Sequence, residues 1–256
     1  MSTPVIGIIG GNGKMGKLFA HFFKKNGIKI LISDRDTKLT NTELAQRSDI
    51  IILSVPIDKT EQIITEIKPH IRPTSALMDL TSIKSAPIKA MLKAKCEVLG
   101  MHPMFGNSNP ISGQTIILCP TKKSSTHSKW IEKLFEKNGV KIIKMTPKQH
   151  DKFMSIAQNL VHFSEIVFAD SLRQQKMPLK QVMECASNSS QQKINSALTL
   201  ITKDPNLYAN MIIENPNALS ALKAHQKSVN ELLKIVENKD KKAFEKYFNK
   251  NKKHFS

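Results

Sequence analysis

One stretch near the start of the chain, Ile6 to Gly16, constrains the fold more than any other. Its apolar first part is typical of a buried strand, and helical apolar spacing begins at Lys17, directly after its glycines. In the order strand, tight turn, helix, glycines permit the turn, let a pyrophosphate approach the backbone and let the helix pack on the strand. The helix N-terminus then faces the phosphates. The stretch therefore predicts a dinucleotide-binding turn, made by Gly11, Asn12, Gly13, Lys14, Met15 and Gly16.

The end of the next predicted strand bears on which dinucleotide binds. The apolar run from Ile28 to Ser33 is followed by Asp34. A carboxylate at this point would accept hydrogen bonds from the hydroxyls of the adenosine ribose and repel a 2′-phosphate. We therefore favour NAD over NADP, although the guanidinium of Arg35 could accommodate that phosphate.

The distribution of glycine divides the chain into two halves. All ten glycines lie at or before Gly139. In the first half, apolar runs at 49–56, 76–82, 98–103, 115–119 and 140–143 alternate with helical segments, which predicts a doubly wound, mostly parallel sheet of the Rossmann type. The Thr146 to Gln149 segment has the form of a capped helix start, and helical spacing continues from there. We predict an α/β dinucleotide-binding domain over 1–145 and an all-helical domain over 146–256.

Polar residues follow several of the predicted strands, at the edge of the sheet where such folds bind ligands. Ser54, Val55 and Pro56 end one strand, Thr81 and Ser82 follow the next, and His102 ends a third. We expect these residues to meet in one crevice beside the cofactor.

The charge of the chain is the main argument for a nucleic-acid partner. The net charge is +18, but only four of the 39 basic residues are arginine, and aromatic residues make up 5%. Arginine and aromatic side chains make most of the contacts to bases and phosphates. We therefore attribute the charge to a solvated, lysine-rich surface, and expect no nucleic-acid partner.

The cysteines and the apolar runs limit the remaining classes of protein. Cys96, Cys119 and Cys185 are too few and too far apart for a disulfide framework or a zinc site, so we expect buried thiols and no metal. No basic-then-apolar leader opens the chain, and no apolar run reaches the about 18 residues of a membrane span. We expect a cytoplasmic protein that makes no membrane contact.

Six blocks of sequence point to a known family. In chain order they are Gly10–Gly16, Ser54–Ile57, Asp79–Lys84, Leu99–Gly106, His150–Asp151 and Asp204–Tyr208. Together they resemble the prephenate dehydrogenase family, in particular the dehydrogenase portion of the bacterial T-protein without its chorismate mutase domain. The resemblance implies the oxidation and decarboxylation of prephenate to 4-hydroxyphenylpyruvate with NAD, on the route to tyrosine. It also implies a homodimer joined through the helical domain.

The resemblance implies a role for particular residues. His102 would be the base that accepts the proton of the ring hydroxyl, a task suited to a neutral histidine near its normal pKa. Ser82 would hydrogen-bond the same hydroxyl and help to hold His102. No metal is needed, because aromatisation of the ring drives the loss of carbon dioxide. Gly106 and His162 are further candidates for substrate binding, whereas we expect His150 and Asp151 to be structural.

One part of the chain departs from the family. Members carry arginines before the Asp-Pro-x-Leu-Tyr block, and one of these binds a carboxylate of the substrate. The matching positions here are Gln191 and Thr199, with Lys203 one helical turn further on as a substitute cation. Two alternatives therefore stand beside prephenate: arogenate or a related cyclohexadienyl or hydroxy acid as substrate, and a catalytically silent NAD-binding regulator.

Overall fold

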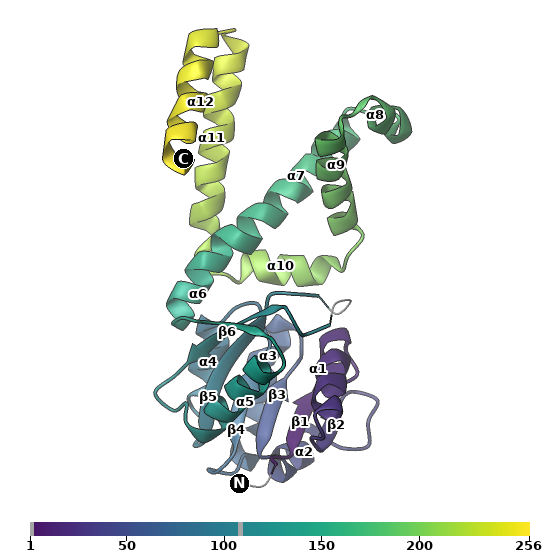
Figure 1. Cartoon of the computed structure of the whole chain (residues 1–256), viewed down its shortest axis with the longest axis vertical. Helices are drawn as coiled ribbons and strands as arrows, with labels where there is room; N and C mark the ends of the chain where they lie inside the picture. The colour runs from purple at the N-terminus through teal and green to yellow at the C-terminus, as the bar shows by residue number, and fades with distance from the viewer. Residues whose placement is uncertain (1–2, 107–109) are drawn as a thin grey trace. The chain divides into compact units, whose positions relative to one another are not determined.

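A computed structural model describes residues 3–106 and 110–256 and divides into two compact units. The first comprises the chain up to Met154 together with Asn206–Asn215, and the second comprises Ser155–Pro205 with Pro216–Ser256. The first unit contains the sheet and the second is helical (Figure 1). The change between units thus lies at 154/155, nine residues beyond the 145/146 boundary that we predict, and a short helical segment returns to the first unit.

The described residues of the first unit contain a seven-stranded sheet in the order β2-β1-β3-β4-β5-β6-β7. Strands β1 to β5 are parallel to one another, whereas β6 runs antiparallel to β5 and parallel to β7. The sheet is therefore mostly parallel, as predicted, with an antiparallel step at the pairing of β5 with β6. The strands are β1 (Ile6–Ile9), β2 (Ile30–Ser33), β3 (Ile50–Leu53), β4 (Ala76–Asp79), β5 (Glu97–Pro103), β6 (Thr115–Pro120) and β7 (Lys141–Lys144).

Helices cover both faces of this sheet, which explains why its central strands are apolar throughout. Aromatic residues of α1 and α5 pack on one face, and α2, α3 and α4 supply the apolar side chains that pack on the other. The helices of this unit are α1 (Lys14–Lys25), α2 (Asn41–Arg47), α3 (Ile57–Ile67), the short η1 (Lys68–His70), α4 (Ser85–Met91), α5 (Thr126–Lys137), α6 (Pro147–Met154) and α10 (Pro205–Ile213).

The turn from β1 into α1 shows why the glycines are needed. Gly10 has a φ of +78°, and a Cβ there would overlap the carbonyl oxygen of Ser54 at the end of β3. A Cβ at Gly16 would lie 2.7 Å from Gly11 Cα and closer still to Gly10 O. The turn can therefore pack against β3, and α1 against the turn, only without these side chains.

The predicted helix start after β7 is confirmed. The backbone N–H of Thr146 donates to Gln149 Oε1 at 3.0 Å, and the backbone N–H of Gln149 donates to Thr146 Oγ1 at 3.2 Å. This reciprocal capping box fixes the first turn of α6. The helix nevertheless belongs to the first unit, because Met154 packs in the core formed with α3 and α4.

The second unit is built from helices that follow a π-helical segment, η2 (Ser155–Leu160). Helix α7 packs on α9, and η2 and α12 pack on α11. Its helices are α7 (Val161–Gln174), α8 (Leu179–Cys185), α9 (Asn188–Ile201), α11 (Ala218–Glu237) and α12 (Lys241–Phe255).

Three further observations bear on the class of protein. Cys96 and Cys119 are buried as expected, but Cys185 is exposed at the end of α8, so that expectation is wrong for one thiol. Within the described ranges, no helix combines the length and the apolar character that crossing a bilayer requires. The same residues contain no group of three or more His, Cys, Asp or Glu side chains that could hold a metal ion.

Candidate active site

The glycine-rich turn has the geometry of a phosphate-binding loop. Gly13 is the N-cap of α1 and has no side chain that could cap the helix, so backbone N–H groups of the first turn face outward. A Cβ at Gly13 would meet only Gly10 O within 4 Å, at 3.2 Å, so this edge of the turn can be approached closely. These features fit the pyrophosphate of a dinucleotide.

The ends of β2 and β3 border this turn. Gly10 N–H donates to Ser33 O at 2.9 Å, and Asn12 N–H donates to Asp34 Oδ2, also at 2.9 Å. Ser54 N–H donates to Ile9 O at 2.8 Å. Hydrogen bonds from backbone N–H groups thus hold three of the predicted cofactor-binding elements together at one edge of the sheet: the turn, Asp34 and the segment that begins at Ser54.

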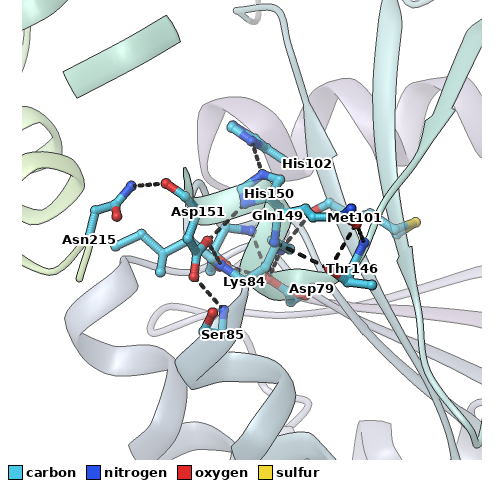
Figure 2. Close-up of polar contacts among 12 residues, drawn as sticks. Asp79, Lys84, Ser85, Met101, His102, Thr146, Gln149, His150, Asp151 and Asn215 are labelled. Carbon is cyan, nitrogen blue, oxygen red and sulfur yellow. Dashed lines mark hydrogen bonds and ion pairs between the residues drawn. The ribbon is translucent and has the colours of Figure 1, made fainter. Parts of the chain in front are cut away.

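His102 lies inside β5 and is buried, with 2% of its surface exposed. Its Nδ1 is 2.8 Å from His150 Nε2, and His150 Nδ1 is 2.9 Å from Asp151 Oδ1 (Figure 2). The three side chains therefore form a continuous hydrogen-bonded series that joins β5 to α6.

The protonation of this series follows from its acidic end. Burial alone would raise the pKa of Asp151, but hydrogen bonds from His150, Ser85 and Lys84 outweigh burial and lower it. An ionised Asp151 requires His150 Nδ1 to carry a proton and His150 Nε2 to accept one from His102 Nδ1. The lone pair of His102 then resides on Nε2, the atom that a general base would use.

The histidines remain neutral near pH 7. Burial, His150 and Lys84 together hold the pKa of His102 well below its ordinary value. Burial also lowers the pKa of His150, against the opposing effect of Asp151. The sequence suggested a histidine with a near-normal pKa, and this expectation is wrong because it took no account of burial beside a lysine.

A buried ion pair lies below the histidines. Lys84 and Asp79 are each 0% exposed, and Lys84 Nζ donates to Asp79 Oδ2 and, at 2.8 Å, to Met101 O. Asp79 Oδ2 also accepts from the backbone N–H of Thr81 at 3.0 Å and from its hydroxyl. The hydroxyl of Thr81, predicted to contact the cofactor, is thus buried in the turn after β4.

Asp151 also fixes the turn that carries Ser82. Its two oxygens accept the backbone N–H groups of Lys84, at 2.8 Å, and Ser85, at 2.9 Å, which begin α4. Ser82 itself is half-buried, and no hydrogen bond from its side chain is found in the described part of the chain. His102 is held by His150, so the expected support from Ser82 is not observed.

The sequence did not identify His150 and Asp151 as part of the site. We expected them to be structural, since nothing local distinguishes a histidine and an aspartate at the start of a helix. The sequence signals were their adjacency, which gives the histidine a carboxylate partner, and their place among the blocks that resemble the family. Their relation to His102 depends on a contact 48 residues apart in the chain.

The predicted substrate residues of the second unit have other surroundings. The side-chain amide of Gln191 donates to Met183 O at 2.9 Å and to Ala186 O at 3.1 Å, so it caps the end of α8. Thr199 and Lys203 are exposed, and His162 Nδ1 lies 3.8 Å from Glu165 Oε2. In the first unit, Gly106 is exposed in the loop after β5, and a Cβ there would meet no atom within 4 Å.

Comparisons with known proteins match both halves of the chain. Residues 21–144 match the family model described as the nucleotide-binding domain of prephenate dehydrogenase, and residues 146–250 match the model of its dimerization domain. A probable arogenate/prephenate dehydrogenase of Methanocaldococcus jannaschii is 34% identical over 98% of this chain. The T-protein of Haemophilus influenzae is 32% identical over 95% of it. The chain spans 60% and 65% of the length of these two relatives.

Solved structures give the same fold. The prephenate dehydrogenase of Aquifex aeolicus, in complex with hydroxyphenyl propionate and NAD+, has a TM-score of 0.81 at 20% identity, covering 98% of this chain and 97% of that one. Synechocystis arogenate dehydrogenase has a TM-score of 0.75 at 19% identity, over 98% and 100% of the two chains. Two domain models matched in order, and relatives that align over nearly the whole sequence, show that the chain belongs to the prephenate dehydrogenase family.

Proposed function

We propose that this protein is an NAD-dependent dehydrogenase that oxidises and decarboxylates prephenate to 4-hydroxyphenylpyruvate. The observation that carries the proposal is the series from His102 through His150 to Asp151. This series supports the proposal because it leaves a lone pair on His102 Nε2, in the sheet that also carries the glycine-rich turn. The named activity of the relatives and the residues of the glycine-rich turn support the same reaction.

In this reaction His102 Nε2 accepts the proton of the ring hydroxyl. NAD+, held by the glycine-rich turn, would supply the acceptor for the hydride that leaves the carbon bearing this hydroxyl. Loss of carbon dioxide then leaves its electron pair in the ring, and His102 returns the proton to the resulting phenolate oxygen. His102 first accepts a proton and later donates it, so its Nε2 must carry a lone pair at neutral pH. The lowered pKa of His102 provides this neutral form.

The remaining residues have supporting roles in this proposal. Ser82 hydrogen-bonds the ring hydroxyl from the turn that Asp151 holds. Gly106 leaves room for the substrate after β5, and Lys203 compensates for the missing arginine by pairing with a carboxylate. His150 and Asp151 are positioning residues, which fix the tautomer and the ring of His102.

A specific observation favours arogenate as the second candidate. Glu165 of α7 is 8% exposed, accepts a hydrogen bond from Ser196 of α9, and faces a His162 that burial keeps neutral. Among the described residues its one ion-pair partner is that histidine, with no lysine or arginine within reach. A buried carboxylate without a cation is costly, and the ammonium group of an amino-acid substrate would compensate it.

The position of this carboxylate strengthens the argument. Ser196 is one helical turn from Thr199, one of the two positions where the family resemblance implies an arginine. The carboxylate of Glu165 is therefore bonded to a residue one helical turn from a position where the resemblance implies an arginine. Such a change suits a substrate whose side chain bears a positive charge, as that of arogenate does.

The decisive experiment is to mix the purified protein with NAD+ and either prephenate or arogenate, and to follow the absorbance of NADH. Turnover of either acid supports the dehydrogenase, and the ratio of the two kcat/KM values identifies the substrate. In a His102→Asn variant we expect turnover to collapse while NAD+ affinity is kept. NAD+ binding without turnover of either acid would instead favour the silent regulator.

The role of Glu165 has its own test. Glu165→Gln keeps the oxygen that accepts from Ser196 and removes the charge. If the substrate is arogenate, Glu165→Gln lowers kcat/KM for arogenate at least about tenfold, as expected for a lost charge-assisted contact. Any turnover of prephenate is unchanged in this variant. Glu231→Gln, at an exposed position of α11, is the matched control. An equal effect of the two substitutions would refute the role of Glu165.

We also propose that the helical unit forms a homodimer. Residues 146–250 match a dimerization domain, and α11 and α12 expose several large apolar side chains. Those on α11 and α12 with 43% or more of their surface exposed are Leu219, Val229, Leu233, Val236, Phe244, Phe248 and Phe255. Light scattering coupled to size-exclusion chromatography tests this, and a mass of one 28.7 kDa chain would refute it.

A further inference from the structure

The turn after β2 carries three charged residues in a row, Asp34, Arg35 and Asp36. Asp34 Oδ2 accepts from Asn12 N–H and Asp34 Oδ1 accepts from Arg35 N–H at 2.8 Å. This first carboxylate is thus fixed by the backbone, with lone pairs remaining on both oxygens for a ribose. Its place at the end of β2 fits the ribose of a dinucleotide.

Asp36 is tied to the glycine-rich turn by a side chain. Asn12 Nδ2 donates to Asp36 Oδ1 at 2.8 Å, while the backbone of the same asparagine donates to Asp34. One residue of the phosphate-binding turn therefore holds both carboxylates. Since Asn12 lies between Gly11 and Gly13, this contact brings Asp36 to the part of the fold that receives the dinucleotide.

The turn itself is held in place by Thr37. Its hydroxyl accepts from Asp34 N–H at 2.8 Å and lies 2.8 Å from Asp34 O, and its backbone N–H donates to that same oxygen at 3.1 Å. These bonds close the turn around Arg35 and Asp36. The position of Asp36 is thus set from both sides, by Thr37 and by Asn12.

The charges of the turn favour a neutral ribose over a phosphorylated one. The hydrogen bond from Asn12 and that from its own backbone N–H lower the pKa of Asp36, so it is ionised at neutral pH. Arg35 is exposed, and no ion pair of its guanidinium is found in the described ranges. Alone, Arg35 would attract a 2′-phosphate, but it lies between two carboxylates.

We propose that Asp36, held by Asn12, is a second determinant of NAD over NADP, which offsets the attraction of Arg35 for a 2′-phosphate. The inference rests on the dinucleotide site of the proposed function. Asp34 accepts hydrogen bonds from the ribose hydroxyls and repels a 2′-phosphate. Arg35 attracts that phosphate, and the negative charge of Asp36 offsets this attraction.

Direct binding measures this without any substrate. NAD+ and NADP+ are titrated separately into the protein by isothermal calorimetry. Asp36→Asn keeps an oxygen for Asn12 and removes the charge, so the Kd for NADP+ falls about five- to tenfold, as expected for one nearby like charge. The Kd for NAD+ stays within about twofold. Glu136→Gln, on the exposed side of α5, makes the same change of net charge at a remote position and is the control.

Two further variants sharpen the test. Arg35→Ala added to Asp36→Asn abolishes the gain in NADP+ affinity, because it removes the cation that Asp36 offsets. The gain also shrinks in high salt, as expected for exposed charges. An NADP+ affinity that Asp36→Asn changes no more than Glu136→Gln does would overturn the inference alone. Failure of the unsubstituted protein to bind NAD+ would overturn the proposed function together with it.

Discussion

Replacement of Lys84 by methionine tests the buried ion pair that lies near His102. Methionine has a similar length and fills the same space, but it leaves Asp79 fully buried with only Thr81 as a partner. Asp79 Oδ1 already has no hydrogen-bond partner among the described residues. Removal of one member of a buried pair costs about 3–5 kcal/mol. We therefore expect the free energy of unfolding of the sheet unit to fall by this amount.

The chain provides a signal for this unit alone. Its single tryptophan, Trp130, lies on α5 in the same unit as Lys84, so its fluorescence follows the relevant unfolding transition in urea. In a thermal scan the expected loss corresponds to a Tm lower by about 6–20 °C, at about 2–4 °C per kcal/mol for a domain of this size.

Two variants decide whether the pair is the cause. Lys144→Met removes a lysine whose Nζ pairs with Glu132 at the surface, with 53% of the lysine side chain exposed, and costs at most about 1 kcal/mol. Adding Asp79→Asn to Lys84→Met removes the orphaned charge, so the double variant is more stable than Lys84→Met alone. The reasoning is refuted if Lys84→Met costs less than about 1 kcal/mol, or if the two losses simply add.

Three other predictions concern the site. Asp151→Asn releases the tautomer of His150, so kcat falls about 100-fold or more while NAD+ affinity is unchanged; full turnover, followed by NADH absorbance, would contradict this. Burial lowers the pKa of both His102 and His150, so as the pH falls below about 6.5 only the unfolded chain binds protons at these two histidines. The free energy of unfolding therefore falls by up to about 1.4 kcal/mol per pH unit for each histidine. Urea midpoints from the tryptophan signal check this, and midpoints independent of pH between 5 and 7 would exclude it. Gly16→Ala overpacks the turn and costs about 1–3 kcal/mol of unfolding free energy. Gly13→Ala, where a Cβ has more room, keeps the melting temperature and weakens NAD+ binding in calorimetry. Equal melting temperatures of the two variants would argue against the steric reasoning.

The parts of the fold that the sequence predicted are those set by local chemistry. The turn leaves no room for a side chain at Gly11 or Gly16, and apolar runs of strand length identify buried strands without reference to partners. Likewise, the Thr146 to Gln149 capping box is a local contact, and it was visible as such.

The sequence does not indicate those surroundings that depend on distant residues. The capping box marks where α6 begins, but the unit to which α6 belongs depends on the packing of Met154 against helices far away in sequence. Helix α10 shows the same limitation, since Asn210 Nδ2 reaches Asp58 Oδ1 at 3.5 Å across 152 positions. Helical spacing indicates that a segment has an apolar face, but it does not indicate which part of the chain covers that face.

In the buried polar cluster, the geometry around His102 and the fold depend on one another. Asp151 caps the start of α4 and sets the tautomer of His150, while the side chain of Asn215, after α10, donates to Asp151 O at 2.9 Å. Capping α4 alone would not require Asp151 to be buried, and supporting His102 alone would not require a buried Lys84 nearby. Burial of these ionisable groups costs several kcal/mol for each ion, so each must be paired. The pairing that stabilises them also orients the ring of His102 and leaves its lone pair on Nε2, because the same hydrogen bonds allow only one arrangement of protons.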